Sequence, residues 1–461
     1  MLFRAQNLGP IRDAELDLSK RLIILAGPNN SGKTYLGWAL YGLSQFSRPL
    51  PCVRKLVDAA LASPTGSYDA GPVQEFIAIF AAELCAAYAK HIHRDFSAAA
   101  KSFASTLLTL TPDEMSSVQT AGSLLGKDLR FRVELDGDTE KTNVQISVIR
   151  HAIRGGRRSE ETELEAVSLS SLAPEVLEEN AHWAMRHLTY HIIRNLFRGE
   201  FTIFPVERIA TTIFSRELLM RRFEMLDEDS GADSGDPLLA KAATGRYPLP
   251  IRHSLRDAND LSAHGNFEGG FSDLADELEG SVLRGRFTVG ERGDVLFFPS
   301  ASPQQPLGLH QSASVVKSLS ALVFYLRHEA RHGDHIIIDE PELNLHPDNQ
   351  RRVAQVLAKA VNRGIKVMMS THSDYLIGEF NNLLMLGRDT PQAAAVRQEL
   401  GYDEASILKP EQVGVYLVSD GMCKPVEVKE TGFEIKTFED AFHSMNRDAQ
   451  TIYSRIFAES E

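Results

Sequence analysis

The sequence predicts an α/β fold with a parallel sheet, and two observations carry this prediction. Short, almost continuous apolar runs occur at Leu22–Leu25, His335–Ile338 and Val367–Ser370, a pattern typical of strands that are buried on both faces of a sheet. Segments with apolar residues at helical spacing alternate with these runs. Strands that alternate with helices in this way indicate a sheet whose strands run in parallel.

Residues 1–45 predict a hairpin, a buried strand and a helix, in that order. Leu2–Asn7 and Ala14–Leu18 flank a turn at Gly9 and Pro10, which is typical of a hairpin. The first apolar run follows, and a glycine-containing segment comes next. Helical spacing begins after Thr34, so we expect a strand, a loop and a helix to follow one another there.

Residues 46–290 predict a long insertion that is mostly helical, with some strands that complete the sheet. Residues 72–110 are rich in Ala and Leu and predict helices. Residues 128–150 alternate between apolar and polar side chains and predict a hairpin, and Phe201–Val206 predicts a further strand. The acidic segment 227–236, which is also rich in Gly and Ser, is expected to be a solvated loop.

Residues 291–400 predict the second part of the sheet. A strand at Val295–Phe298 precedes an amphipathic helix at Ser314–Ala330. After the second apolar run we expect a helix at Asp348–Asn362, with Gly364 as its C-terminal stop.

Residues 401–461 are expected to add strands and a last helix to this part. The pattern Thr437-x-x-Asp440 is typical of a helix start. The whole chain of 461 residues has room for about three domains.

The composition indicates an acidic globular protein with reduced cysteines. Hydrophobic residues make up 43% and charged residues 24%, which excludes a largely disordered chain or a bare coiled coil. The net charge of −13 excludes a general polycation for nucleic acid, so DNA contact would require a local basic patch. Cys52, Cys85 and Cys423 form no C-x-x-C pair, which argues against disulfides or a cysteine-rich zinc site. With no secretory signal and no bilayer-length apolar stretch, we expect a cytoplasmic protein without membrane contact.

A phosphate-binding motif lies between the first apolar strand and the helix after it. The pattern G-x-x-x-x-G-K-[ST] is matched by Gly27, Pro28, Asn29, Asn30, Ser31, Gly32, Lys33 and Thr34. Glycines let backbone N–H groups point inward at phosphate oxygens, and the helix presents its positive end to the same anion. We expect Lys33 to reach the β- and γ-phosphates of ATP and the Thr34 hydroxyl to bind Mg²⁺. The strand–helix context favours this interpretation over a glycine turn without nucleotide.

Two acids follow the second apolar strand. Asp339 is expected to hold Mg²⁺, and Glu340, one residue later, to polarise the attacking water. Alone, such a pair is also typical of a loop start, but the phosphate motif and these acids would meet at the carboxyl edge of one sheet. Lys33 and Asp339 are 306 residues apart in the sequence, so a long insertion divides the predicted ATPase.

The residues from Asp339 to Gln350 resemble the segment D-E-P-E-x-x-L-H-P-x-x-Q of the OLD-like ATPases. These are AAA/ABC-type ATPases related to the RecF and SMC proteins. Thr371–Ser373 resembles their T-H-S switch, and Gln311–Ser318 occupies the position of the ABC signature. The resemblance implies an ABC-type P-loop ATPase head that is split by the insertion.

The resemblance also implies that two heads face each other and bind ATP between them. Ser312 and Ser314 of one copy would then cap the γ-phosphate held by the other, and His372 would sense it. Alternatively, Ser312–Ser318 is a plain helix cap and His372 an ordinary core histidine. For Glu207 and Arg208 a surface salt bridge is the favoured interpretation.

After His372 no Asp-x-Asp pattern occurs, so we expect no nuclease of the Toprim type in this chain. The chain therefore resembles stand-alone ATPases of antiphage systems such as Septu and PARIS, in which a separate effector, usually a nuclease, associates with the ATPase. The alternatives are a RecF-like DNA-repair ATPase and an ATP-dependent assembly scaffold with little turnover. The arginines around Gly155 predict either a solvated hairpin tip or a contact with DNA or an acidic partner: Arg150, Arg154, Arg157 and Arg158.

Overall fold

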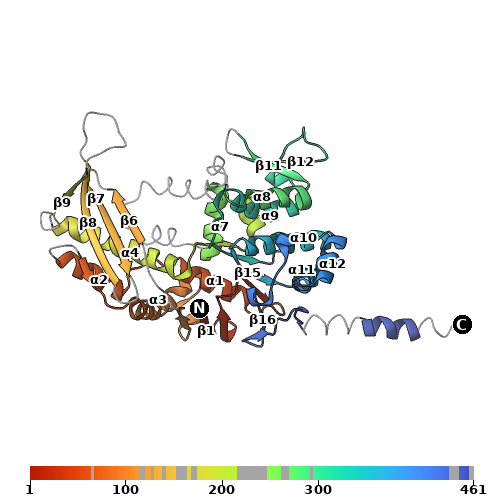
Figure 1. Ribbon diagram of the computed structural model, residues 1–461, viewed down its shortest axis with the longest axis horizontal. Coiled ribbons are helices and arrows are strands. Elements are labelled where there is room, and N and C mark those ends of the chain that lie inside the picture. Colours follow the sequence, from red (N-terminus) through yellow and green to blue (C-terminus); the bar gives the residue numbers. More distant parts are fainter. Residues whose placement is uncertain are drawn as a thin grey trace. The chain divides into compact units, whose positions relative to one another are not determined.

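The computed structural model divides into two compact units (Figure 1). The first unit comprises residues 1–6, 39–93 and 99–201, and the second unit comprises residues 7–38, 94–98 and 202–461. The structure describes residues 1–63, 67–113, 120–125, 129–137, 142–151, 164–167, 174–214, 247–260, 269–290, 294–435 and 446–455.

The second unit is built on a sheet that joins distant parts of the chain. Its strands hydrogen-bond in the order β10 (Phe201–Phe204), β14 (His335–Asp339), β15 (Lys366–Thr371), β3 (Leu22–Ala26), β16 (Val413–Ser419), β17 (Met422–Val426) and β2 (Ile11–Asp17). The four strands from β14 to β16 pair in parallel. The prediction of an α/β fold with a parallel sheet is therefore confirmed. Because β3 lies between β15 and β16, the sheet is completed only by segments on both sides of a long insertion.

Burial explains why the short apolar runs form strands. Every residue of β3 and β14 is buried, and their side chains share one core with helices that cover the sheet. Each fully buried Leu or Ile contributes about 1.5–3 kcal/mol relative to an exposed side chain. A short strand with three or more consecutive aliphatic side chains is thus a strong determinant of where the sheet forms.

The helices of the second unit follow the apolar spacing in the sequence. Helix α9 (Ser314–Phe324) continues into a π-helical turn, η5 (Tyr325–Glu329), within the range predicted. Helix α10 (Pro347–Asn362) ends just before Gly364, whose φ is +96°, as expected for a helix stop. Residues 208–214 are also helical. Further helical segments are α7 (Leu249–Asp260), α8 (Ser272–Glu277), η3 (Leu278–Leu283), η4 (Leu309–Gln311), α11 (Asp374–Met385), α12 (Pro391–Leu400), η6 (Glu404–Ser406) and η7 (Pro410–Gln412).

A small antiparallel sheet of the second unit contains β11 (Gly285–Val289), β12 (Val295–Pro299) and β13 (Leu307–Gly308). Helix α1 (Lys33–Ser44) begins in the second unit and ends in the first. Near the C-terminus, residues 446–455 form a helix inside the range predicted for one.

The first unit combines helices with a second antiparallel sheet. The sheet contains β4 (Ser67–Asp69), β6 (Thr120–Leu125), β7 (Leu129–Gly137), β8 (Thr142–His151) and β9 (Leu164–Val167). Its helices are α2 (Pro51–Ala62), α3 (Val73–Asp95), η1 (Ala100–Phe103) and α4 (Pro174–Phe197). The predicted hairpin is therefore present as β7 and β8.

One sequence prediction in the first unit is wrong. The stretch 72–110 was expected to be helical, but β5 (Leu107–Thr111) is a strand that pairs with the first residues of β1 (Leu2–Leu8). Leu108 and Leu110 are buried while Leu107 is exposed, which is the alternation of a half-buried strand. Pairing with a segment about 100 residues away outweighs the helix propensity of this stretch, which is rich in Ala and Leu.

Several predictions fall outside the described residues: the acidic segment 227–236, the arginines 154, 157 and 158, and the helix start at Thr437. Within the described part of the chain, no helix combines the length and the apolar character that a membrane crossing needs. Cys52, Cys85 and Cys423 are free thiols. Burial raises the pKa of Cys85 and of Cys423 to about 12, so neither forms a thiolate at neutral pH.

Candidate nucleotide-binding site

The loop from Gly27 to Thr34, here called the cradle, connects β3 to α1 as predicted. Gly27 and Gly32 adopt φ of +139° and +105°, conformations that L side chains rarely adopt. A Cβ atom on Gly27 would lie 2.1 Å from the carbonyl oxygen of Val418 in β16. The backbone of the cradle is therefore pressed against a neighbouring strand, and only glycine fits at this position.

Polar groups in the cradle are turned inward. Lys33 is only 6% exposed, and its Nζ donates hydrogen bonds to the carbonyl oxygens of Gly27 (3.0 Å) and Pro28 (2.9 Å). Burial lowers the pKa of Lys33, whereas the nearby Asp339 and Glu340 raise it. The buried Ser31 hydroxyl has no hydrogen-bond partner among the described residues. An inward ammonium and a buried hydroxyl without a partner fit a ligand with phosphate oxygens.

Asp339, at the end of β14, lies next to the helix that follows the cradle. Its Oδ1 accepts a hydrogen bond from Ser370 Oγ (2.8 Å), and its Oδ2 accepts one from Trp38 Nε1 (3.1 Å). Trp38 belongs to α1, the helix that begins at Lys33, so a direct contact joins residues that are about 300 positions apart. Asp339 is 2% exposed, and this burial, together with the charge of Glu207, raises its pKa to about 6.

Glu340 occupies a strained position beside His372. Its φ is +48°, and a left-handed conformation costs a non-glycine residue about 1–3 kcal/mol. Its N–H donates to the Ser370 carbonyl oxygen (3.0 Å), and its Oε1 lies 3.8 Å from His372 Nε2. Burial and the charge of Lys33 lower the pKa of His372, which favours a neutral imidazole at pH 7.

The second glutamate of the motif, Glu342, connects the turn after β14 to the end of β15. Its Oε1 accepts hydrogen bonds from Thr371 Oγ1 (2.9 Å) and from the N–H of His372 (2.7 Å). Its Oε2 is buried without a partner in the described structure, and burial raises the pKa of this carboxyl. The adjacent Ser373 caps α11 by accepting from the N–H of Leu376 (3.1 Å). The sequence contained Glu342 in the motif but gave no indication of this contact.

Arg208 corrects another sequence prediction. A surface salt bridge was favoured for Glu207 and Arg208, but Arg208 is 2% exposed and donates to backbone oxygens. Its acceptors include the carbonyl oxygens of Asp339 (2.6 Å) and Glu340 (2.6 Å). Burial lowers the pKa of Arg208 to about 10, opposed by the nearby carboxylates, so the guanidinium keeps its charge at neutral pH. No sequence pattern distinguishes a buried arginine of this kind from an exposed one.

The two serines of the expected signature lie outside this contact network. Ser312 is buried, and its hydroxyl donates to the Gly308 carbonyl oxygen (3.0 Å). Ser314 is exposed in the first turn of α9, whose N-cap, Ala313, makes no side-chain hydrogen bond. Among the described residues neither serine hydroxyl bonds to the cradle. The structure thus unites the cradle, Asp339, Glu340 and His372, and leaves Ser312 and Ser314 apart.

No cluster of three or more metal-ligating side chains occurs among the residues that the structure describes. Mg²⁺ in nucleotide sites is held by few protein ligands, together with phosphate oxygens and water. Thr34 and the buried Asp339 suit such a site, because Mg²⁺ prefers oxygen ligands. Thr34 can offer its hydroxyl oxygen, and Asp339 can offer a carboxylate oxygen.

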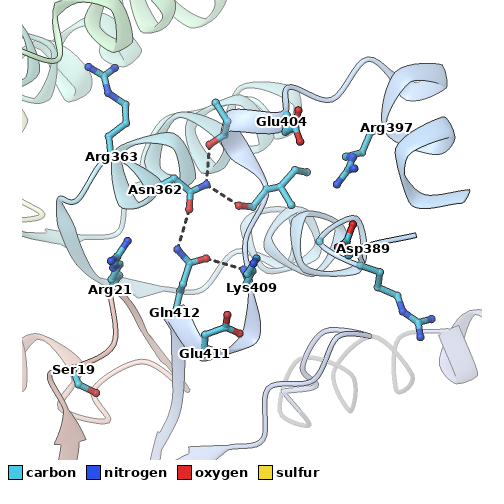
Figure 2. A pocket seen from close by; sticks show the side chains of 14 residues that line it. Ser19, Arg21, Asn362, Arg363, Asp389, Arg397, Glu404, Lys409, Glu411 and Gln412 are labelled. Carbon is cyan, nitrogen blue, oxygen red and sulfur yellow. Dashed lines mark hydrogen bonds between the residues drawn. The ribbon is translucent and has the colours of Figure 1, made fainter. Parts of the chain in front are cut away.

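A separate cavity of about 830 Å³ lies elsewhere in the second unit (Figure 2). Its lining includes Arg21 and Gln412, which directly precede β3 and β16, so it lies at the opposite ends of these strands from the cradle. Figure 2 shows Asn362 among the residues that line it. The Asn362 side chain donates to the carbonyl oxygens of Ala405 (2.8 Å) and Ile407 (2.7 Å) and accepts from Gln412 (3.0 Å). This cavity shares no lining residue with the cradle.

The parallel sheet and the glycine-containing cradle together fit a nucleotide site of the P-loop type. Residues 264–377 match the family model described as "AAA ATPase domain". That range contains Asp339, Glu340, Glu342 and His372 but not the cradle. None of the curated proteins matches the chain.

Among solved structures, the chain is similar to SMC heads. An SMC head bound to the C-winged helix domain of ScpA has 11% identity and a TM-score of 0.34, over 92% of this chain and 96% of that one. The SMC head domain from Thermotoga maritima has 10% identity and a TM-score of 0.32, over 93% and 98%. An SMC head with an extended coiled coil, bound to the C-terminal domain of ScpA from Pyrococcus furiosus, has 13% identity and a TM-score of 0.32, over 97% and 98%.

Proposed function

We propose that this protein binds ATP in the cradle and hydrolyses it. The contact between Trp38 and Asp339 (3.1 Å) carries the proposal, because it brings the phosphate motif and the predicted magnesium ligand into one site. In this proposal the N–H groups of the cradle and the N-terminus of α1 bind the phosphates. Lys33 exchanges its two backbone acceptors for phosphate oxygens. Thr34 and Asp339 would hold Mg²⁺, which neutralises charge on the phosphates.

Glu340 is the proposed general base, and His372 is proposed to orient the attacking water or to sense the γ-phosphate. The carboxylate of Glu340 is partly exposed and lies 3.8 Å from the imidazole. A carboxylate that accepts a proton from water needs a free oxygen near that water, whereas the buried Asp339 would be occupied by Mg²⁺. This difference supports Glu340 over Asp339 as the base.

ATP is further proposed to hold two copies of the chain together. The exposed Ser314 at the start of α9 presents a hydroxyl and the positive end of a helix, which suit an anion held by a second copy. Ser312 would support this role from the preceding turn. Hydrolysis would then release the contact between the copies.

For the biological role we propose control of a separate effector, which by the resemblance is a nuclease, in bacterial antiphage defence. A cytoplasmic location follows from this role. The resemblance of the motifs to stand-alone ATPases of such systems supports it. Co-purification with the products of neighbouring genes tests it: a nuclease that binds supports the role, and recombination proteins would favour the DNA-repair alternative.

The enzymatic proposal is tested by phosphate release from saturating Mg²⁺-ATP, with the Glu340→Gln variant as the control. The wild type should turn over and the variant should bind ATP without turnover. Equal rates would contradict the role of Glu340, and negligible rates in the wild type would favour an assembly scaffold. Size-exclusion chromatography in the presence and absence of ATP tests whether ATP holds two copies together.

A further inference from the structure

Arg208 has no part in the proposed chemistry, yet its side chain connects three elements of the second unit. It follows the end of β10, and its Nη1 donates back to the Pro205 carbonyl oxygen (3.2 Å). Its Nε donates to both oxygens of Ser318 in α9, at 3.1 Å and 3.2 Å. The remaining bonds go to the carbonyl oxygens of Asp339 and Glu340.

The last two bonds fix the backbone on which Glu340 stands. The carbonyl oxygens of two successive residues point at one guanidinium, while the N–H of Glu340 is held from the other side by Ser370. These restraints act on a residue whose φ of +48° is unfavourable for any side chain other than glycine. The conformation that aims the Glu340 carboxylate is therefore maintained by contacts from outside the turn.

We propose that Arg208 is a positioning residue for hydrolysis, which holds the Glu340 backbone in its strained conformation and ties it to α9. The inference rests on the proposed function, in which Glu340 is the base. Arg208 touches neither carboxylate by a hydrogen bond in the described structure, so it acts through the main chain. Since α9 begins at Ser314, a shift of this helix would be passed on through Ser318 and the guanidinium to Glu340.

The geometry requires arginine in particular. A guanidinium is planar and carries its N–H donors on three nitrogens in a fixed arrangement. Here these three nitrogens bond five acceptor oxygens, with the N–H of Nε shared between the two oxygens of Ser318. A lysine has one nitrogen on a flexible stem, so it can replace the charge but cannot bond both carbonyl oxygens and Ser318 at once. Lysine at this position should keep the fold and lose the alignment.

The test compares Arg208→Lys and Arg208→Gln with the wild type and with Arg397→Gln. Arg397, in α12 of the same unit, donates one bond to the Leu386 carbonyl oxygen (3.0 Å) and serves as the control for loss of an arginine. Turnover, KM and ATP affinity are measured together with the melting temperature. We expect kcat to fall about 100-fold in both Arg208 variants, as for a small misplacement of a catalytic group, with ATP affinity and KM unchanged within about threefold. Arg397→Gln should match the wild type.

Two results would overturn the inference. If kcat of Arg208→Lys stays within about threefold of the wild type, the alignment does not depend on the guanidinium. If both Arg208 variants lose ATP binding and thermal stability together with kcat, Arg208 serves the fold alone. Failure of the proposed function is separate, because it would appear in the wild type as turnover that Glu340→Gln does not reduce.

Discussion

The cradle and the turn after β14 lie in one site but are held in place in different ways. The cradle is a contiguous loop whose glycines set its path and whose Lys33 bonds to its own carbonyl oxygens. The turn after β14 takes its conformation from distant partners, namely Arg208 for its carbonyl oxygens and Thr371 for Glu342. The path of the cradle backbone is thus set mainly by residues of the loop itself, whereas the alignment of a catalytic group here depends on side chains from distant segments of the second unit.

If this comparison holds, changes in the turn should separate catalysis from binding, and the largest effect should come from Glu340→Gln. Loss of the carboxylate removes the proposed base, and general-base catalysis is worth about 100- to 10,000-fold. Steady-state phosphate release should fall by that factor while the affinity for ATP stays the same. A parallel loss of affinity would show that the two regions do not act separately.

The converse change is Lys33→Ala in the cradle, which should act on binding. Each charge-assisted hydrogen bond that is lost costs about 1.5–3 kcal/mol, so ATP affinity should fall about 10- to 100-fold. Lys20→Ala, which removes a partly exposed lysine that donates to the Glu411 carbonyl oxygen (2.9 Å), is the matched control. Calorimetric titration with ATP measures the affinity of both variants. An unchanged affinity for Lys33→Ala would contradict the proposal that the cradle binds ATP.

A smaller effect is expected for Glu342→Gln, which tests whether the turn and the switch act together. The carboxylate accepts from both Thr371 and the backbone of His372, and the neutral amide weakens both bonds because charged acceptors bind more strongly. Turnover should fall about tenfold, with the ATP affinity retained. Glu430→Gln, in an exposed pair with Arg388, should change neither quantity. Wild-type turnover in Glu342→Gln would show that the bonds from Thr371 and His372 to this carboxylate are not needed.

The smallest effect should come from Trp38→Phe, which removes the direct bond between α1 and Asp339. A hydrogen bond to a carboxylate is worth about 1.5–3 kcal/mol, but Asp339 keeps its second donor, Ser370 Oγ. Only part of that energy should be lost, so the Mg²⁺ concentration for half-maximal turnover should rise about fivefold. Trp183→Phe, at a tryptophan that stacks on His187 in the first unit, is the control. An unchanged Mg²⁺ requirement would indicate that the position of Asp339 relative to the cradle does not depend on this hydrogen bond.

The difference between local and long-range contacts also explains which features could be predicted from the sequence. The buried strands of the parallel sheet, the helix stop at Gly364 and the position of the cradle between a strand and a helix depend on residues within a short window, and the structure has them as predicted. The binding of nucleotide by the cradle stays a prediction. The roles of Trp38, Arg208 and Glu342 depend on which residues the fold brings together, and no spacing in the chain encodes that. The strand at Leu107–Thr111 was missed for the same reason, because its pairing partner is β1.

The neighbours of β3 in the sheet have a consequence for how the protein is made. The cradle rests on a strand whose two neighbours, β15 and β16, begin at Lys366 and Val413, more than 300 residues later. During synthesis the phosphate loop leaves the ribosome early, but its walls, including the Val418 carbonyl oxygen against Gly27, arrive near the end. Such long-range pairing is slow to form. Nascent chains stalled before β16 should therefore not be retained on immobilised ATP, although they already contain every residue of the motif.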